Sequence, residues 1–358
     1  MCGEESKKGL KVPKVYAEDV RLWLYKNGLI DRMYNPIREG DYIIFPLIGK
    51  LEVNQIEYLS RFNVELVDRV FSKREVVPKS LYDVLERSLT SAELALVPGS
   101  IDIIGEIALI EIPDELWSKV ELIGKAVMHV HKNVRAVYAK RSVRGVYRVR
   151  DLKFIIGEPI TETLHKEYGA RFLVDVTKAF FDPRLSWEHN RVANLVKKGE
   201  VVVDMFSGVG PFAIQIARKV DCKVYAIDLN PDAYNYLVEN IELNKVSDKV
   251  VPIHGDARVI IQEMLRNVAD RVIMNHPSQS HEFLSSACMA LKSNGVIHFY
   301  SFQSEPNPVE KAVRLFNNSI NGVGCKVKKI MYSRKVKSTA PHEYLVVLDV
   351  EVIKLLNG

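Results

Sequence analysis

The segment from Val201 to Phe212 (VVVDMFSGVGPF) constrains the fold of this chain more than any other. Three β-branched residues lead to Asp204, a short loop carries Gly208 and Gly210, and an apolar stretch typical of a helix follows. This order is typical of a buried strand that enters a glycine turn at a helix N-terminus. Glycine has no side chain, so a ligand can approach the turn closely. The segment predicts an α/β domain that binds a nucleotide.

The acid at the end of this strand indicates which nucleotide binds. Asp204 directly precedes the glycine loop, where a dinucleotide dehydrogenase usually has no carboxylate, and it can hydrogen-bond a cationic amino group. The methionyl end of S-adenosylmethionine carries such a group. The spacing of Gly208, Gly210 and Ala213 also fits the NAD fingerprint, so this motif alone leaves both cofactors open.

Three later segments are also expected to be strands that end in polar residues. Lys223–Asp228 ends in an acid about 20 residues past the glycines, where a ribose-binding carboxylate is expected. Val250–Asp256 ends in an acid that can accept from the adenine amino group, and Asp270–Pro277 closes on Asn-x-Pro. Ligands of open α/β sheets bind at the carboxyl ends of the strands, which favours a Rossmann-like, S-adenosylmethionine-dependent methyltransferase domain. Its predicted cofactor contacts are Asp204, Phe206, Gly208, Gly210, Asp228, Asp256, Ala257 and Asn275.

The length of 358 residues predicts more than one domain. Residues 1–75 are expected to form a small α+β domain, with residues 1 to about 10 as a disordered leader. Residues 79–180 are expected to form a second α+β domain that binds RNA. Residues 181–358 then form the methyltransferase domain, which ends in an antiparallel hairpin at the edge of its sheet.

Composition narrows the class of protein. Hydrophobic residues make up 47% of the chain and charged residues 27%, as in an ordinary soluble protein. No apolar run approaches the roughly 20 residues of a membrane span. The four cysteines show no paired spacing, so we expect neither a disulfide framework nor a metal site. We therefore expect a cytoplasmic protein that does not bind a membrane.

Basic residues concentrate in one stretch. Nine lysines or arginines lie between Lys125 and Lys153, with Asp151 as the only acid and with aromatic residues interleaved. This stretch fits a footprint on a phosphate backbone, although a solvated basic face remains the alternative. A second basic cluster spans Lys326 to Lys337.

The junction before the methyltransferase domain carries further candidates. It reads Phe181-Asp-Pro-Arg-Leu-Ser-Trp-Glu188 and combines aromatic residues, an arginine and an acid. Glu188 is suitably placed to act on a reacting base above the cofactor pocket. It is equally suited to stabilise a helix N-terminus through the macrodipole, and the spacing alone leaves both interpretations open.

Together, these motifs resemble the archaeal and eukaryotic tRNA (guanine-37 N1) methyltransferases. The similarity rests on Phe181–Glu188, Asp204–Phe212 and Asn275-His-Pro277, and it spans roughly residues 100 to 350. The N-terminal domain resembles, more weakly, that family's mobile first domain, which is of a tRNA-recognition type. The resemblance implies a tRNA substrate, S-adenosylmethionine as cofactor, a monomer and no protein partner.

The resemblance also implies roles for single residues. Arg148 matches the arginine that donates to guanine O6, and Glu188 matches the general base that removes the N1 proton. Asn275 and Pro277 match the motif that positions the target base. Phe180 stands where the family often has tyrosine, so stacking is kept and a hydroxyl is lost. The implied substrate contacts are Arg148, Phe180 and Arg184.

This chemistry is physically consistent. Guanine N1 is a poor nucleophile until its proton leaves, and the negative charge that then develops on O6 is stabilised by a cationic donor. The base must also leave its stack to reach the pocket. Two alternatives use the same scaffold, namely a relative that also methylates a wyosine intermediate and an aminocarboxypropyl transferase. A non-catalytic RNA-binding module and an NAD-dependent hydride transferase are less favoured.

Overall fold

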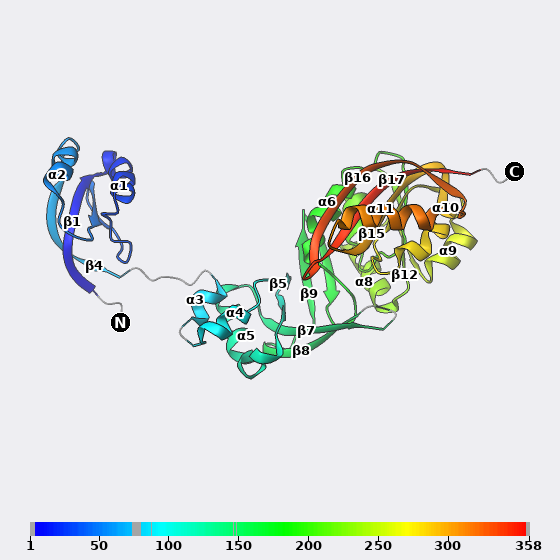
Figure 1. Ribbon diagram of the computed structural model, residues 1–358, viewed down its shortest axis with the longest axis horizontal. Helices are drawn as coiled ribbons and strands as arrows, with labels where there is room; N and C mark the ends of the chain where they lie inside the picture. The colour runs from blue at the N-terminus through cyan, green and yellow to red at the C-terminus, as the bar shows by residue number, and fades with distance from the viewer. Residues whose placement is uncertain (1–3, 74–79, 87, 146, 148, 356–358) are drawn as a thin grey trace. The chain divides into compact units, whose positions relative to one another are not determined.

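A computed structural model describes residues 4–73, 80–86, 88–145, 147 and 149–355. The chain divides into two compact units, residues 1–79 and residues 80–358 (Figure 1). Each unit has its own hydrophobic core. Among the described residues, no helix combines the length and the apolar character that a membrane span needs.

The first unit is a four-stranded sheet with helices α1 (Ala17–Lys26) and α2 (Val53–Ser60). Its strand order is β2-β3-β1-β4. The strands are β1 (Glu4–Pro13), β2 (Ile37–Glu39), β3 (Tyr42–Pro46) and β4 (Glu65–Ser72). Buried leucines and valines such as Leu10, Val12, Val20 and Leu24 form the core.

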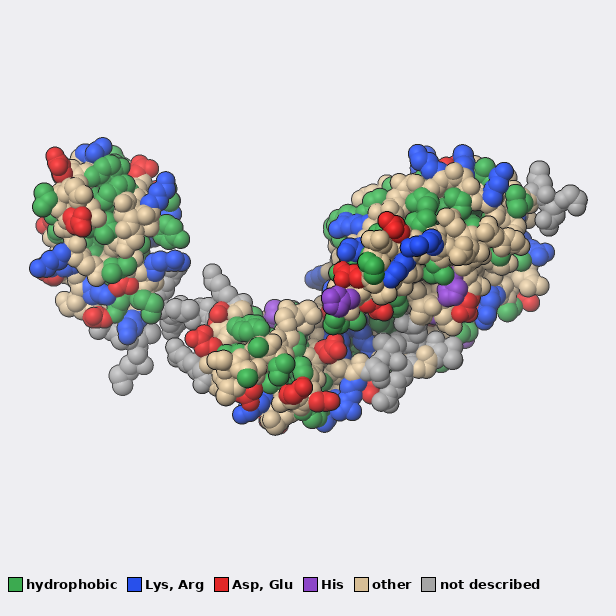
Figure 2. Space-filling model, in the orientation of Figure 1, with side chains coloured by type: hydrophobic (Ala, Val, Ile, Leu, Met, Phe, Trp, Pro, Cys, Tyr) green, Lys and Arg blue, Asp and Glu red, His purple; other side chains and the backbone are tan. Residues whose placement is uncertain are grey.

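The prediction of a disordered leader is wrong from residue 4 onward, because β1 pairs with both β3 and β4. Among its early polar residues, Lys8 is exposed and donates to Asp68 at 2.6 Å, whereas Lys7 is partly buried and pairs with Asp31. Gly9 allows the strand to pack tightly, since a Cβ there would lie 2.7 Å from Ile44 and from Phe71. Figure 2 shows acidic and basic side chains interspersed on the visible face of this unit.

The second unit begins with two short helices and a four-stranded sheet of order β5-β6-β7-β8. Helix α5 packs against β7 and β8 of this sheet, with Ile123 and Val127 fully buried. An antiparallel pair of strands, β9 and β10, follows. The bounds are α3 (Leu81–Leu85), α4 (Ser91–Leu96), β5 (Ile101–Ile104), β6 (Ile107–Glu111), α5 (Val120–Val130), β7 (Ala136–Arg144), β8 (Val149–Gly157), β9 (Glu162–Glu167) and β10 (Ala170–Asp175).

A seven-stranded sheet of order β13-β12-β11-β14-β15-β17-β16 completes the second unit. Its first five strands are parallel, and β17 joins β15 and β16 in antiparallel fashion. The predicted edge hairpin is therefore present. The strands are β11 (Val201–Asp204), β12 (Lys223–Asp228), β13 (Val250–His254), β14 (Ala269–Met274), β15 (Leu291–Ser304), β16 (Cys325–Ala340) and β17 (Glu343–Lys354).

Helices cover both faces of the parallel strands. Helices α7 and α8 contribute Ile214 and Leu237 to one core cluster, whereas α9 to α11 contribute Ile261, Ala287 and Phe316 to the other. The bounds are α6 (Ser186–Ala193), α7 (Pro211–Lys219), α8 (Pro231–Leu243), α9 (Ala257–Met264), α10 (Leu284–Ala290) and α11 (Pro308–Ile320). The strand order reverses at β11, which lies between β12 and β14, and ligands bind at such switch points.

Candidate active site

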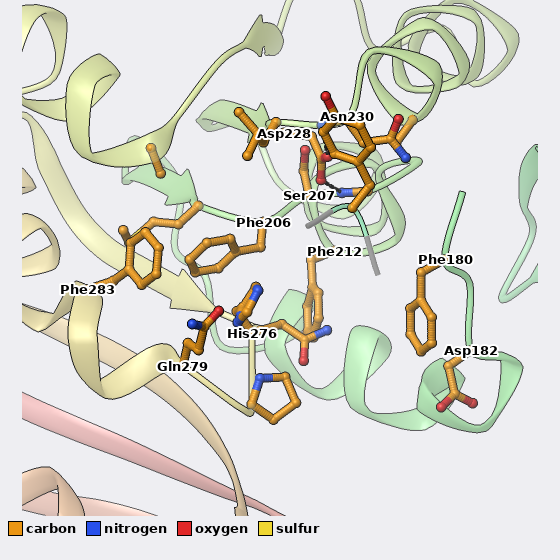
Figure 3. A pocket seen from close by; sticks show the side chains of 18 of the residues that line it. Phe180, Asp182, Phe206, Ser207, Phe212, Asp228, Asn230, His276, Gln279 and Phe283 are labelled. Atoms are coloured by element: carbon orange, nitrogen blue, oxygen red, sulfur yellow. Dashed lines mark hydrogen bonds between the residues drawn. The ribbon is translucent and has the colours of Figure 1, made fainter. Parts of the chain in front are cut away.

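A cavity of about 720 Å³ opens at the carboxyl ends of β11 to β14. Figure 3 shows Asp228 and Asn230 on one side of it, Phe206, His276 and Phe283 on a second side, and Phe180 with Asp182 on a third. Most of the predicted cofactor contacts line it, namely Phe206, Gly208, Asp228, Asp256, Ala257 and Asn275. The sequence motifs therefore converge on a single cavity.

The glycine turn adopts left-handed backbone conformations. Gly208 has φ +53° and Gly210 has φ +95°, a region in which an L side chain is strained. Gly208 lines the cavity. Gly210 does not lie among the lining residues, and a Cβ there would meet Leu237 at 2.7 Å. Gly210 therefore acts through close packing at the start of α7, and only Gly208 faces the ligand space.

Asp204 and Asp228 both end strands beside this turn. Asp228 accepts from the backbone N–H of Gly208 at 2.6 Å and of Asn230 at 2.9 Å. Asp204 is fully buried, and its Oδ2 has no hydrogen-bond partner among the described residues. Burial, followed by the charge of Asp228, raises the pKa of Asp204 to about 8. An uncompensated buried carboxylate is costly, so this acid suits a cationic ligand group.

A third acid closes the cavity at the start of α9. Asp256 caps this helix by accepting from the backbone N–H of Arg258 at 2.8 Å. The Arg258 side chain also donates to both carboxylate oxygens of Asp256, which lowers the pKa of this acid. The Arg258 guanidinium lies 4.9 Å from the ring centre of Phe283, and Phe283 lies edge-on to Phe206. This arrangement provides an aromatic wall for a flat ligand ring.

The Asn-x-Pro motif follows β14 directly. Asn275, His276 and Pro277 all line the cavity. The His276 ring lies 4.9 Å from that of Phe206, so it extends the aromatic wall. The main-chain carbonyl of His276 accepts from the buried hydroxyl of Ser280 at 2.9 Å. The motif therefore lies in a fixed loop at the cavity edge.

The junction segment supplies the opposite wall. Phe180, Phe181 and Asp182 line the cavity, whereas Arg184 points its guanidinium at Asp102 of β5, with an Nε–Oδ1 distance of 3.1 Å. Phe180 receives the guanidinium of Arg150 over its ring at 4.8 Å. Arg148 lies outside the described residues.

Charged side chains from five parts of the second unit (β5, β7, β8, the junction segment and β16) meet beside Phe180, and we call them the cationic cluster. Asp102 lies 2.9 Å from Lys140 and 3.7 Å from Arg150, and Lys337 pairs with Asp182. The members are Lys140, Arg150, Arg184 and Lys337 with Asp102 and Asp182. The four cations exceed the two carboxylates, so the cluster carries uncompensated positive charge.

Three of the four cations are largely buried, whereas the Arg184 side chain is 39% exposed. The Arg150 side chain is 8% exposed, and its Nη1 has no hydrogen-bond partner among the described residues. Burial, together with the nearby charge of Arg150, lowers the pKa of Lys337 to about 8. Lys337 also lines the cavity. Because buried cations need a counter-charge, the cluster is suited to binding an anion at the cavity edge.

Glu188 does not line this cavity. It is buried at 1% exposure in the first turn of α6, and both carboxylate oxygens are engaged. Its Oε1 accepts from Tyr300 Oη and from Arg191 Nη2, each at 2.6 Å, and its Oε2 accepts from Arg191 Nε at 2.9 Å. The residue that reaches the cavity from α6 is the next one, His189.

His189 forms a buried pair with Glu167. The ring Nδ1 of His189 lies 2.9 Å from Glu167 Oε2, and Phe212 packs edge-on against the ring. Burial alone would raise the pKa of Glu167, but His165 and His189 lower it to about 2. Glu167 is therefore ionised and orients the imidazole of His189.

Comparison with known proteins identifies the family. The tRNA (guanine(37)-N(1))-methyltransferase Trm5b of Pyrococcus abyssi is 42% identical over 344 residues, which cover 96% of this chain and 98% of that protein. The chain belongs to the TRM5/TYW2 methyltransferase family. The TRM5/TYW2 methyltransferase domain matches residues 163–337, the TYW2 N-terminal domain residues 81–161 and the tRNA methyltransferase 5 N-terminal domain residues 9–54.

Two further comparisons bear on the chemistry of this TRM5/TYW2 chain. The solved complex of aTrm5 and tRNALeu superimposes with a TM-score of 0.78 at 34% identity, covering 96% of this chain and 99% of that one. A tRNA(Phe) (4-demethylwyosine(37)-C(7)) aminocarboxypropyltransferase of Methanocaldococcus jannaschii is 40% identical over 209 residues. That match covers 58% of this chain and 81% of the relative.

Several cavity residues of the TRM5/TYW2 chain were not singled out from the sequence. Asn230 and Lys337 line the cavity, and Asn230 also caps α8 while donating to the carbonyl of Lys178 at 2.8 Å. The Asn-Pro dipeptide after β12 carried the signal for Asn230. Lys337 belongs to the second basic cluster of the sequence, which did not indicate that it reaches the cavity. His189 gave no local signal, because only long-range contacts bring it there.

Proposed function

We infer that the chain is a tRNA methyltransferase that transfers a methyl group from S-adenosylmethionine to N1 of guanosine 37, next to the anticodon. The observation that carries this inference is the match to Trm5b over 96% of the chain and 98% of that protein. It includes both units, and the tRNA complex matches over the same extent. The aminocarboxypropyl transferase match covers a smaller part of the chain.

The cavity fits the proposed cofactor. Asp228 suits the ribose, and Asp256 with the Phe206–Phe283 wall suits the adenine. Asp204 does not lie among the residues that line the cavity, but it directly precedes the lining residues Met205 and Phe206, and its unpartnered Oδ2 suits the cationic amino group. When bound, S-adenosylmethionine supplies an electrophilic methyl group. The protein residues then have to orient the guanine, accept its N1 proton and exclude water.

We propose that the target base enters between Phe180 and the Asn-x-Pro motif. Phe180 offers an aromatic face, and Asn275 and Pro277 position the base edge. Arg148 retains the O6 role that the resemblance implies. Arg184 contributes as a member of the cationic cluster, which binds a phosphate close to the flipped nucleotide.

Glu188 is proposed as the base that removes the N1 proton. In this structure it forms hydrogen bonds to Tyr300 and Arg191, so its carboxylate must turn toward the cavity when the substrate arrives. Catalytic hydrogen bonds often form only in the substrate complex. His189 is the second candidate, since it lines the cavity and pairs with the ionised Glu167.

The deciding experiment uses unmodified tRNA transcripts with guanine or adenine at position 37. S-adenosylmethionine is labelled either in its methyl group or in its aminocarboxypropyl carbons. We expect methyl label on the guanine transcript only, with 1-methylguanosine as the product by mass spectrometry. Transfer of aminocarboxypropyl label would contradict the proposal. A further methylation of tRNA carrying the wyosine intermediate would place the chain in the bifunctional branch.

We further propose that the enzyme is a cytoplasmic monomer with three functional parts. Residues 1–75 form a mobile tRNA-recognition domain, residues 79–180 an RNA-binding domain and residues 181–358 the methyltransferase domain. Light scattering of the enzyme alone and with tRNA tests the monomer. Deletion of residues 1–75 should weaken tRNA binding while S-adenosylmethionine still binds, as calorimetry would measure.

A further inference from the structure

The carboxylate of Glu188 is the end of a buried hydrogen-bonded network that runs through the sheet. Arg191, which holds Glu188, also donates to Asp349 of β17 at 2.6 and 3.2 Å. Asp349 in turn lies 2.6 Å from His298 Nδ1 of β15. His298 is fully buried and Asp349 is 2% exposed. Solvent therefore screens the charges of these buried residues only weakly.

The donors in this network can be assigned. Arg271 Nη1 lies 3.0 Å from His298 Nε2. Because a guanidinium only donates, Nε2 of His298 accepts, and Nδ1 carries the proton that is donated to Asp349. Burial lowers the pKa of His298, which agrees with a neutral ring.

The charges around Arg191 favour the uptake of one proton. Two carboxylates, Glu188 and Asp349, share the single guanidinium of Arg191, and His298 is neutral. Arg271 is balanced by its own partner, Glu200. Glu188, Arg191 and Asp349 therefore carry one net negative charge while Glu188 is ionised. When Glu188 takes a proton, Arg191 and Asp349 remain as a balanced pair. A buried cation left without a partner would be costly, and Asp349 removes that cost.

We propose that Asp349 and Tyr300 are positioning residues that set Glu188 to accept the guanine N1 proton, a role that rests on the proposed function. Asp349 keeps Arg191 paired after Glu188 becomes neutral, and Tyr300 holds Glu188 while it is ionised. In the step itself, the proton passes from N1 to a Glu188 oxygen. The N1 electron pair forms the bond to the methyl carbon, and the electron pair of the broken carbon–sulfur bond stays on sulfur.

Five elements place titratable or charged groups around Glu188. Tyr332 of β16 lies with its ring over the Arg191 guanidinium at 4.4 Å. His189, on the same helix as Glu188, pairs with Glu167 of β9. The full set comprises Arg191 and His189 on α6, Glu167 on β9, Tyr300 and His298 on β15, Tyr332 on β16 and Asp349 on β17.

The proposal predicts opposite effects on the pH profile of methyl transfer. Tyr300→Phe removes a donor to the ionised carboxylate of Glu188, so the acid limb of the rate profile moves to higher pH. Asp349→Asn removes a neighbouring negative charge, so the acid limb moves to lower pH. We expect each limb to move by about one pH unit. Asp349→Asn should also lower the plateau rate by about tenfold, because Glu188 becomes a weaker base.

The measurement is the single-turnover rate from pH 5 to 9 with saturating S-adenosylmethionine and tRNA transcript. Tyr344→Phe is the matched control, because Tyr344 of β17 also donates to a glutamate, Glu305, at 2.8 Å, and Tyr344 does not lie among the residues that line the cavity. Its profile should match the wild type. Melting temperatures identify variants that are merely unfolded. If Asp349→Asn is unfolded, the proposal is tested by comparing the pH profile of Tyr300→Phe with that of Tyr344→Phe.

Glu188→Gln separates the role of Glu188 as the base from the positioning roles of Tyr300 and Asp349. If this variant keeps nearly the wild-type rate, Glu188 is not the base, and the positioning roles are overturned with it. If Glu188→Gln is slow but Tyr300→Phe leaves the acid limb and the rate unchanged, only the positioning proposal is overturned. Shifts of both variants in the same direction would also overturn it, since a purely structural effect would act in that way.

Discussion

The two halves of the cavity are built in different ways. The half that we propose binds the cofactor, the cofactor half, comes from one continuous stretch, in which β11 to β14 deliver Gly208, Asp228, Asp256 and Asn275 to the same edge of a parallel sheet. The half that we propose binds the target nucleotide, the acceptor half, collects side chains from strands and loops that lie far apart in the chain, such as Lys140 and Lys337. The first half depends on local backbone geometry, and the second depends on long-range packing and buried charge.

This difference explains how each half responds to its ligand. In the cofactor half, backbone groups such as the N–H of Gly208 already hold Asp228 in place. In the acceptor half, charges are satisfied among themselves, as in Glu188 with Arg191 and Lys337 with Asp182. The cofactor half is therefore preformed, whereas the acceptor half must exchange internal partners for substrate.

The largest expected effect separates the two candidate bases of α6. Glu188→Gln should lower the single-turnover rate by roughly 100-fold, the usual scale for a positioned base, with little change in cofactor affinity. His189→Gln keeps a polar side chain at the cavity wall and should cost far less. If the larger loss falls on His189→Gln, the base is the residue that lines the cavity, and the internal pairing of Glu188 is only structural.

The second effect tests whether the cofactor half depends on one buried charge. Asp204→Asn should weaken S-adenosylmethionine binding by about 10- to 100-fold, the scale of a charge-assisted hydrogen bond. The same change should raise the melting temperature of the free protein at pH 8, because it removes an uncompensated buried carboxylate. Calorimetry and thermal melts measure both. Unchanged affinity would remove Asp204 from the cofactor site.

The sequence predicted the cofactor half more completely than the acceptor half. Glycines and strand-end acids reveal their geometry locally, so Gly208, Asp228 and Asp256 were found from spacing. Gly210 was the exception, since its contact with Leu237 of α8 exists only in the folded protein. Four parallel strands and the edge hairpin also followed from local pattern, whereas β15, which joins them, was not predicted.

Tertiary contacts explain what the sequence did not reveal. The start of β1 is rich in charged residues and was predicted to be disordered, yet it pairs with β4 from Glu4 onward, and from Gly9 the strand pairs with β3 as well. Backbone pairing therefore overrides local propensity here. Glu188 accepts from Arg191, three residues later on the same helix, and from Tyr300, 112 residues further along the chain. The spacing of Glu188 and Arg191 is that of a helical ion pair, but no local pattern could indicate Tyr300, or Asp349, which pairs with Arg191.

The third effect tests the charge excess of the acceptor half. Lys337→Met should weaken tRNA binding by about tenfold and reduce the salt slope by about 0.7 to 0.9. Lys326→Met, an exposed lysine of the same strand, is the control. The pKa of Lys337 lies near 8 in the free protein, so wild-type affinity should also fall as the pH rises through 8. A pH-independent affinity would contradict a phosphate contact at this lysine.

The smallest effect concerns the proton of Asp204. Burial raises the pKa of this carboxyl to about 8, so the free protein carries a proton there at pH 7, and a cationic ligand group displaces it. The same raised pKa makes the free energy of unfolding of the free protein fall as the pH rises from about 4 toward 8, because the folded state holds this proton more tightly than the unfolded state. Binding of S-adenosylmethionine at pH 7 should therefore release up to about one proton.

Calorimetry in two buffers of different ionisation enthalpy counts this proton. Release should decline toward pH 9, where Asp204 is already ionised in the free protein. Asp256→Asn is the control, because its pKa is lowered by Arg258 and it carries no proton at pH 7. If the Asp204→Asn variant still releases a proton when it binds S-adenosylmethionine, the proton comes from another group. A second titrating residue would then have to lie in the cofactor half, and this half would not be preformed in its charge state.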